Sequence, residues 1–322
     1  MTYYHIDTDM GVDDGLALLV ADRLLPRIHA LSTVYGNAPL ATATRNALIF
    51  RELLGGDACW PVFKGADRSS DDFRHHAPNV HGEDGLGGAT SSVEPALLNR
   101  VSLAHVDGIE RLVPPANSES MTIIGLGPAT NIPRLVSRFG RETVKEIVLM
   151  SGSFFDRGNI TVTAEFNAYC DPPALQATLD LGIPVTLVPL DVCRKVQLLR
   201  STVQAYATSD PSAVMKLVIA SHMSYMDSYQ ATEHIDGCFP HDTITVLVAL
   251  EPERFFHISG SIKVERDAFH RGQTRIVLGK SHVRVVTGGD LAWVREILSR
   301  SPHSRPSTHA PLTPPRARAE KA

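Results

Sequence analysis

Four carboxylates crowd into a short stretch near the start of the chain, Asp7-Thr-Asp9-Met-Gly-Val-Asp13-Asp14. Asp7 and Asp9 face the same side of a strand, while Asp13 and Asp14 open a helical pattern, where they are equally well explained as ordinary helix-capping acids. Converging carboxylates repel one another and are driven toward protonation unless a cation compensates. An oxygen-only ligand set favours a hard ion, calcium or magnesium, over zinc.

A histidine and a carboxylate, His241 and Asp242, form a second candidate site later in the chain. They precede the apolar run from Ile244 to Leu250, and this pattern predicts the start of a helix. A single pair of this kind is more commonly a helix cap than a functional site. It gains weight only from the carboxylates elsewhere in the chain.

Short strands and helices alternate along the chain, as expected of parallel strands joined by crossover helices. We predict an α/β fold, Rossmann-like in the broad sense, in which one mostly parallel central sheet is flanked by helices within a single domain. Ligands of such sheets bind beyond the carboxyl ends of the strands. Strands are expected at 3–9, 28–34, 121–124, 146–150 and 185–188, and helices at 13–25, 39–54, after Pro128 and at 172–181.

The chain has 322 residues, 43% of them hydrophobic and 20% charged, with a net charge of -4. This composition is typical of a globular protein and favours a small-molecule substrate over nucleic acid or an anionic membrane. Four scattered cysteines, no signal-peptide pattern and no long apolar run predict a cytoplasmic protein without membrane spans. Residues 1–300 form the predicted domain, and 301–322 form a Pro/Arg-rich tail that is expected to be disordered.

The order of the motifs resembles the inosine-uridine preferring nucleoside hydrolase family. The first carboxylate stretch matches the family signature DxDPGxDD, and the resemblance extends to about residue 300. The further matching stretches are Thr33-Val-Tyr-Gly-Asn37, His81-Gly-Glu-Asp-Gly-Leu-Gly87, Gly127-Pro-Ala-Thr-Asn131, Gly158-Asn-Ile-Thr-Val-Thr-Ala-Glu-Phe-Asn167, Pro189-Leu-Asp191 and His241-Asp242.

The resemblance implies hydrolysis of the bond between ribose and a nucleobase. It implies that Asp9, Asp14, Asp242 and the main-chain carbonyl of Leu126 bind Ca²⁺. Asp9 would also hold the metal-bound water and take its proton as the general base. Asp7 would lie behind these ligands and orient them.

The sugar and base would be held by further groups that the resemblance carries over. Asp13 and Asn37 would bind the 2′ and 3′ hydroxyls, Asn167 the 3′ hydroxyl, and Asn159 with Glu165 the 5′ end. We expect Glu165 to Asn167 to be extended, so that the two polar side chains share a face. Singly, Asn37 and Asn159 are equally well explained as turn residues.

The departing base needs a proton, for which His241 is the candidate acid and His81, in a glycine-rich loop, is the competitor. A helix N-terminus disfavours imidazolium at His241. Tyr225 and Tyr229 are candidates for stacking on the base, although both also fit an amphipathic helix.

Three residues depart from the family pattern. Met10 stands where proline is usual, Gly15 where alanine is common, and Thr243 where proline is common. None of them removes a ligand or a base. They affect only how rigid the turn after the first strand and the first residues of the two helices are expected to be.

Two other interpretations fit part of the sequence. A haloacid dehalogenase-like Mg²⁺-dependent phosphotransferase would share the opening DxD but lacks a clear downstream lysine here. A non-catalytic ribose- or nucleoside-binding protein would have lost Asp9 or the ligands, which are all present. The resemblance also suggests a homodimer or homotetramer.

Overall fold

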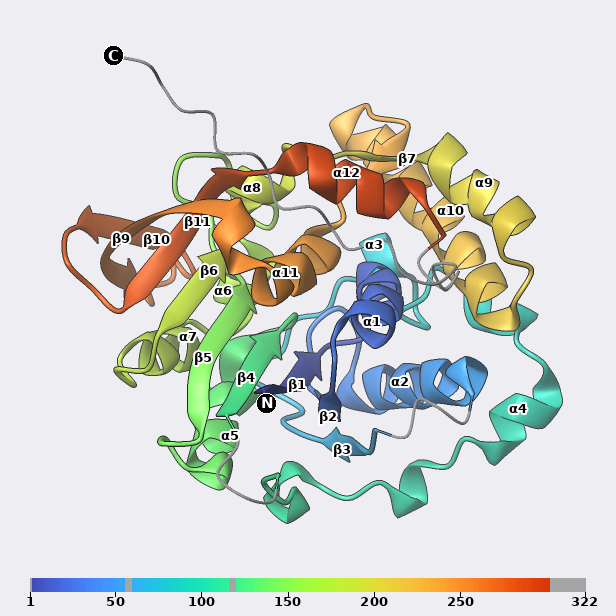
Figure 1. The fold of residues 1–322 in the computed structure, drawn as a ribbon, viewed down its shortest axis with the longest axis horizontal. Coiled ribbons are helices and arrows are strands. Elements are labelled where there is room, and N and C mark those ends of the chain that lie inside the picture. Colours follow the sequence, from blue (N-terminus) through green and yellow to red (C-terminus); the bar gives the residue numbers. More distant parts are fainter. Residues whose placement is uncertain (1, 56–59, 116–119, 302–322) are drawn as a thin grey trace.

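The structure, a computed structural model, describes residues 2–55, 60–115 and 120–301. Its centre is a nine-stranded sheet with the order β10-β9-β11-β6-β5-β4-β1-β2-β3 (Figure 1). The strands are β1 (Thr2–Thr8), β2 (Ile28–Thr33), β3 (Val62–Lys64), β4 (Ser120–Gly125), β5 (Val144–Met150), β6 (Val185–Val188), β9 (Phe255–Val264), β10 (Thr274–Leu278) and β11 (Val283–Gly289).

Seven of these strands are parallel, and β9 is antiparallel to both β10 and β11. The prediction of a mostly parallel sheet is therefore confirmed. The antiparallel edge was not predicted, because β9 and β10 follow one another without the intervening helix on which the prediction of the parallel strands depended. The carboxyl ends of β1, β4, β5 and β6 meet at one edge of the sheet.

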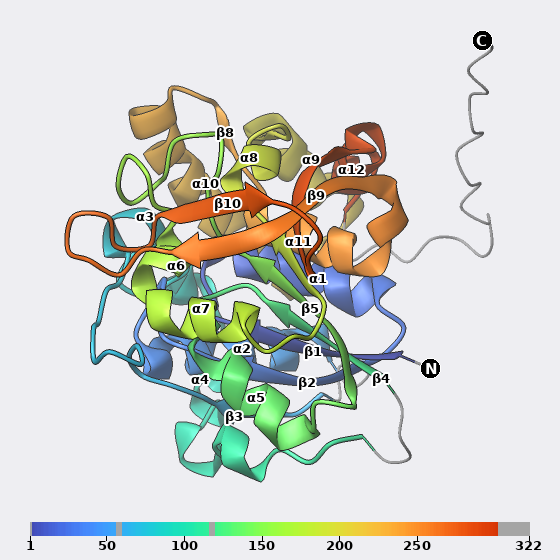
Figure 2. The same ribbon diagram turned by 90° about the vertical axis from the view of Figure 1, so that its left-hand side faces the viewer.

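Helices cover both faces of the sheet, as Figures 1 and 2 show: α5 and α7 lie on one face, and α1, α2 and α11 on the other. The longer helices are α1 (Val12–Leu24), α2 (Leu40–Leu54), α5 (Ile132–Phe139), α7 (Pro172–Leu179), α9 (Arg200–Ser209), α10 (Ala213–Glu233), α11 (His241–Leu250) and α12 (Leu291–Ser299). The short helices are α3 (Pro78–His81), α4 (Pro95–Arg100), α6 (Phe166–Cys170) and α8 (Leu190–Cys193).

Successive strand residues point into two separate cores. On β4, Ile123 packs in the cluster beneath α5 and α7, whereas its neighbour Ile124 packs in the cluster beneath α1 and α11. On β5, Ile147 and Val148 divide in the same way. This period of two, with both sides apolar, is the pattern of a sheet buried on both faces.

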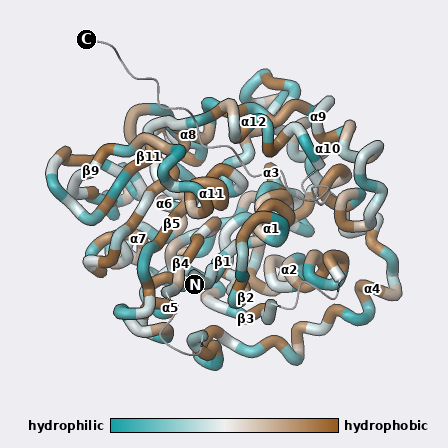
Figure 3. The backbone as a smooth tube through the Cα atoms, viewed as in Figure 1, coloured by the Kyte–Doolittle hydropathy of each residue, from teal (hydrophilic) through white to brown (hydrophobic). Residues whose placement is uncertain are grey.

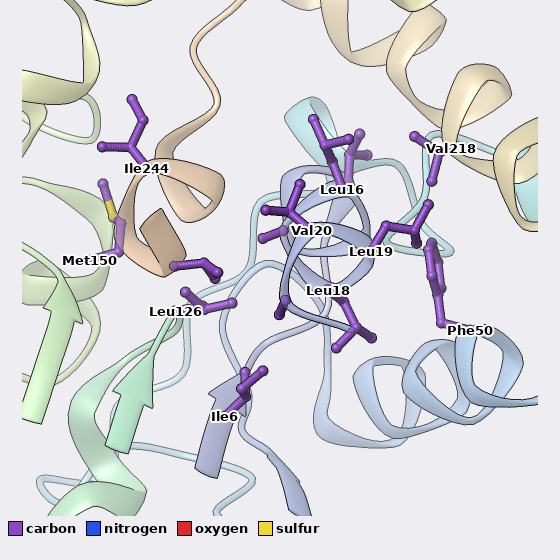
Figure 4. Packing of buried hydrophobic residues seen from close by; sticks show 14 of the residues in the cluster. Ile6, Leu16, Leu18, Leu19, Val20, Phe50, Leu126, Met150, Val218 and Ile244 are labelled. Atoms are coloured by element: carbon purple, nitrogen blue, oxygen red, sulfur yellow. The ribbon is translucent and has the colours of Figure 1, made fainter. Parts of the chain in front are cut away.

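Helix α1 lies at the centre of the larger core. Every residue from Val12 to Ala21 is buried, and Figure 3 shows the helix as predominantly hydrophobic. Figure 4 shows its side chains lying among Ile6 of β1, Phe50 of α2 and Val218 of α10. A helix that is apolar on all sides must be enclosed on all sides, so the first turn of α1 is fixed within the molecule.

Helices α9 and α10 and the two-stranded sheet of β7 (Leu198–Leu199) and β8 (Gly237–Cys238) stand beyond the carboxyl edge of the main sheet. Ser301, the first residue of the predicted tail, is buried, and its hydroxyl lies 3.2 Å from Asp210. Residues 302–322 lie outside the described part of the chain. No helix within the described residues is long and apolar enough to cross a bilayer.

Candidate active site

Three carboxylates meet where two helices begin. Asp13 and Asp14 lie in the first turn of α1 and Asp242 in the first turn of α11, and one oxygen from each lies within 4.8 Å of the other two. All three side chains are buried. The positive ends of the two helix dipoles favour negative charge at this point, but they do not replace the water that burial removes.

Asp9 lies beside this group, just past the end of β1. The Asn37 amide links the two, because its Nδ2 donates to Asp9 Oδ1 at 3.1 Å and to Asp14 Oδ2 at 3.2 Å. The Asn37 main-chain N–H donates to Asp9 Oδ2 at 2.7 Å. Gly36 permits this approach, since a Cβ there would lie 2.0 Å from Asp9 Oδ2.

Asp7 is buried and does not line the cavity, but it is hydrogen-bonded to residues near the carboxylate group. Its carboxylate accepts hydrogen bonds from Asn131 Nδ2 at 2.8 Å and from the Ser32 hydroxyl. Its main-chain carbonyl accepts from the Leu126 N–H at 2.8 Å. Asp7 is thus placed to fix the chain at Leu126, whose carbonyl is the predicted main-chain ligand.

The first turn is rigid although Met10 replaces the usual proline. Met10 has φ 41°, a conformation closed to proline, and its N–H donates to Thr8 Oγ1 at 3.0 Å. Thr8 Oγ1 in turn donates to Asp14, and the Gly11 N–H donates to Asp14 Oδ2 at 2.8 Å. Hydrogen bonds to Thr8 and Asp14 therefore hold this turn in a conformation that a proline at position 10 could not adopt.

Burial and mutual repulsion push these carboxylates toward the protonated form. Burial, and then the charge of Asp14, raises the pKa of Asp13 to about 8. Burial is also the main cause that raises the pKa of Asp9, Asp14 and Asp242, and it raises the pKa of Asp7 to about 7.

The donor set suits a hard divalent cation. It consists of buried carboxylates, and Asp13 Oδ1 has no hydrogen-bond partner within the described residues. A cation would offset the repulsion that raises their pKa values. The chain thus holds a carboxylate cluster able to bind a metal ion.

Glu165 and Asn167 are fixed by helix α6. Glu165 caps the helix and accepts from the N–H groups of Asn167 at 2.6 Å and Ala168 at 2.9 Å. Asn167 Nδ2 donates to the carbonyls of Leu126 at 2.8 Å and Met150 at 3.0 Å, at the ends of β4 and β5. The prediction of an extended segment was wrong here: Glu165 is extended, but the helix begins at Phe166, because the buried carboxylate satisfies the helix's first N–H groups.

The two candidate acids lie on opposite sides of a tyrosine pair. His241 Nε2 lies 3.0 Å from Tyr229 Oη, which lies 3.3 Å from Tyr225 Oη, and the Tyr225 ring packs against the His81 ring. The Val12 N–H donates to His81 Nδ1 at 3.1 Å, and His81 ends α3 rather than lying in the loop that follows. Burial lowers the pKa of His81 and of His241 to about 3.

A cavity of about 590 Å³ opens above these groups. Asp13, Asn37, Asn167 and Asp242 line it, whereas Asp7, Asp9 and Asp14 lie outside its lining and are buried. The other predicted residues that line it are His81, Leu126, Asn159, Glu165, Tyr225, Tyr229 and His241.

Several residues that line the cavity were not predicted from the sequence, including His76, Phe166, Arg194, Glu233 and Phe239. Arg194 had a signal, because it follows the Pro189-Leu-Asp191 motif after a strand end. Phe239 also had one, because it lies two residues before His241. Glu233 had none of its own, since it is the last residue of α10 and only the packing of that helix brings it to the cavity.

Comparison with known proteins agrees with this geometry. Residues 4–296 match the family model described as inosine-uridine preferring nucleoside hydrolase. The chain is 32% identical over 258 residues to the inosine-uridine preferring nucleoside hydrolase of Crithidia fasciculata, covering 77% of this chain and 78% of that one. It is 30% identical over 286 residues to a probable uridine nucleosidase 2 of rice (Oryza sativa subsp. japonica), covering 85% and 81%.

Among solved structures, a plant nucleoside hydrolase superposes with a TM-score of 0.83 at 27% identity, covering 94% of this chain and 99% of that one. A superposition over this share of both chains confirms the predicted fold. A haloacid dehalogenase-like phosphotransferase is excluded by these matches. The chain belongs to the inosine-uridine preferring nucleoside hydrolase family and is an enzyme that cleaves ribonucleosides by hydrolysis.

Proposed function

We propose that the enzyme hydrolyses ribonucleosides with Asp9 as the general base and with Ca²⁺ held by Asp9, Asp14, Asp242 and the Leu126 carbonyl. The observation that supports this most is the convergence of buried carboxylates from both ends of the chain beneath one cavity. Oxygen-only donors are the ligands that calcium prefers. When bound, such a cation supplies Lewis-acid activation of water.

Asp9 takes the proton from the attacking water in this proposal. The two Asn37 donors hold its carboxylate in one orientation, so little reorganisation is needed when the proton moves. As the glycosidic bond breaks, positive charge develops on the ribose, and the surrounding carboxylates stabilise it.

Two of the groups assigned to the ribose hydroxyls have an oxygen that is free to form hydrogen bonds in the described structure. Asp13 Oδ1 has no partner in the described structure, and Asn167 uses its Nδ2 on two carbonyls, which leaves its Oδ1 for the sugar. We assign Asp13 and Asn37 to the 2′ and 3′ hydroxyls, Asn167 to the 3′ hydroxyl, and Asn159 with Glu165 to the 5′ end.

In this proposal the departing base contacts aromatic and histidine side chains that also line the cavity. Tyr225 and Tyr229 offer aromatic surface there, and His241 and His81 are the candidate donors. Because burial keeps both histidines neutral at ordinary pH, a ring that gives its N–H proton to the base would have to take a proton at its other nitrogen. For His241 the Tyr229 hydroxyl, 3.0 Å from Nε2, is placed to supply it.

Substitution of Asp9 tests the proposal. We expect Asp9→Ala to lower kcat for uridine and inosine by at least about 100-fold, because the proton acceptor is lost. Released base is measured by chromatography, with folding checked by circular dichroism. The matched control is Asp107→Asn, at a half-exposed aspartate that pairs with Arg111, which should retain full activity. Near-normal turnover by Asp9→Ala would remove Asp9 as the base.

We also propose a homodimer or homotetramer in the cytoplasm. The family resemblance supports the assembly, and three cysteines of the described chain, Cys170, Cys193 and Cys238, are free and buried, as in a reducing compartment. Cys59 lies outside the described residues. Light scattering on the purified protein tests the assembly, and a monomer at micromolar concentration would contradict it.

A further inference from the structure

The short helix α8 holds one rim of the cavity. Asp191, in its first turn, accepts from the main-chain N–H of Phe154 at 2.9 Å and of Phe155 at 2.6 Å. These residues follow β5 and begin the segment 154–159. The Pro189-Leu-Asp191 motif, which has no part in the proposed chemistry, therefore fixes the start of this segment.

Arg194, directly after α8, holds the far end of the same segment. Its guanidinium donates to the main-chain carbonyls of Arg157 and, at 3.2 Å, of Gly158. It also lies 3.2 Å from the Asp156 carboxylate. Only 12% of the Arg194 side chain is exposed, so protein encloses most of the guanidinium, and its hydrogen bonds are charge-assisted. Reaching several acceptors at once requires the planar fork of arginine.

Asn159 immediately follows this anchored point. Its Oδ1 accepts from the Phe166 N–H at 2.8 Å, which leaves the Nδ2 donors for the cavity. Its own main-chain N–H donates to the Ala164 carbonyl at 3.1 Å. Gly158 approaches the Ala164 carbonyl so closely that a Cβ there would lie 2.1 Å from it. The segment has little room to shift without moving Asn159.

We infer that Arg194 is a positioning residue for recognition of the ribose 5′-hydroxyl, acting by fixing Arg157 and Gly158 so that the Asn159 amide faces that hydroxyl. This inference rests on the proposed assignment of Asn159 to the 5′ end. Arg194 also lines the cavity, but its donors are directed to the segment 156–158. It acts on the substrate through Asn159.

A comparison of uridine with 5′-deoxyuridine tests the inference. For Arg194→Ala we expect kcat/KM on uridine to fall by roughly 10- to 100-fold, because a small misplacement of a binding group is costly. On 5′-deoxyuridine, which lacks the hydroxyl, the same variant should change little. Asn159→Ala should show the same selectivity, and the double variant should be no worse than Asn159→Ala alone.

Two further variants control the experiment. Arg194→Lys keeps the charge but not the fork, so it should give a smaller loss with the same substrate selectivity. It also serves as the test if Arg194→Ala fails to fold. Arg111→Ala, at an arginine whose side chain is 72% exposed, should behave as the wild type on both substrates.

The outcomes separate the two claims. Equal losses on both substrates for Arg194→Ala, or additive losses in the double variant, would overturn the role of Arg194 while Asn159→Ala still supports the 5′ assignment. If Asn159→Ala loses as much kcat/KM on 5′-deoxyuridine as on uridine, the assignment of Asn159 to the 5′ end fails. The role of Arg194 then fails with it. Neither result bears on Asp9 as the base.

Discussion

At the scale of single residues, burial sets the chemistry that each group can perform. His241 is 7% exposed, and burial is the first cause of its low pKa, ahead of the charge of Arg194. The sequence indicated only that a helix N-terminus disfavours imidazolium. The structure adds that the ring is enclosed and that its Nε2 lies 3.0 Å from Tyr229 Oη.

This environment leads to a prediction about the leaving group. His241→Ala should lower kcat for inosine by about 100-fold or more, since natural bases depart poorly without a proton. It should have little effect on p-nitrophenyl riboside, whose leaving group needs no acid. Steady-state rates on both substrates, compared with those of His81→Ala, identify the donor. A selective loss in His81→Ala alone would assign the role to His81 instead.

At the scale of elements, the positions of the carboxylates depend on how α1 packs. Gly15 stands where alanine is common in the family, and the structure explains the glycine. A Cβ on Gly15 would lie 2.5 Å from the Phe50 ring of α2. The glycine therefore allows α1 and α2 to pack closely at this point.

We expect Gly15→Ala to destabilise the protein by about 1–3 kcal/mol, because the added methyl group overpacks a closed core. The free energy of unfolding is measured by urea denaturation. Adding Phe50→Leu to Gly15→Ala should recover part of the loss, whereas Gly279→Ala, where a Cβ would meet nothing within 4 Å, should be nearly neutral. If Gly15→Ala proves as stable as the wild type, Phe50 does not explain the glycine.

At the scale of the whole molecule, the carboxylate cluster joins the two ends of the fold. Asp13 and Asp14 come from the first helix, and Asp242 comes from a helix more than two hundred residues later. Asp9, between the first strand and that helix, lies beside them. A cation bound here would cross-link these parts and stabilise the folded state by mass action. Without it, the carboxylates repel one another.

The pH dependence has a definite sign. Folding raises the pKa of Asp13 from 3.8 to about 8, so its contribution to stability is present at low pH and is lost as the pH rises through about 8. The Tm of the chelated protein should therefore fall between about pH 5 and about pH 9. Calcium should raise the Tm by several degrees at the upper end, where it displaces no proton, and by less at low pH.

Thermal scans with EDTA and with added calcium measure this effect, and EDTA should also abolish turnover. Asp242→Asn should weaken the response to calcium. An enzyme that is fully active when verified free of metal, with a Tm that calcium leaves unchanged at every pH, would refute the cation's role.

The sequence by itself determined the alternation of strands and helices and the position of polar groups at strand ends, because both follow from local periodicity and from turn residues. It therefore predicted β1, α1, β2, α2 and β6 within a residue or two. The resemblance then supplied site residues, most of which line one cavity in the structure.

Only the tertiary structure decided how distant groups meet. Local pattern suggested an extended Glu165 to Asn167, but Glu165 caps α6 because its carboxylate is buried against four donors. Likewise, nothing near Arg194 in sequence shows that its fork reaches the carbonyls before Asn159. Contacts of this kind depend on which elements pack together, and packing is a property of the folded chain rather than of any segment.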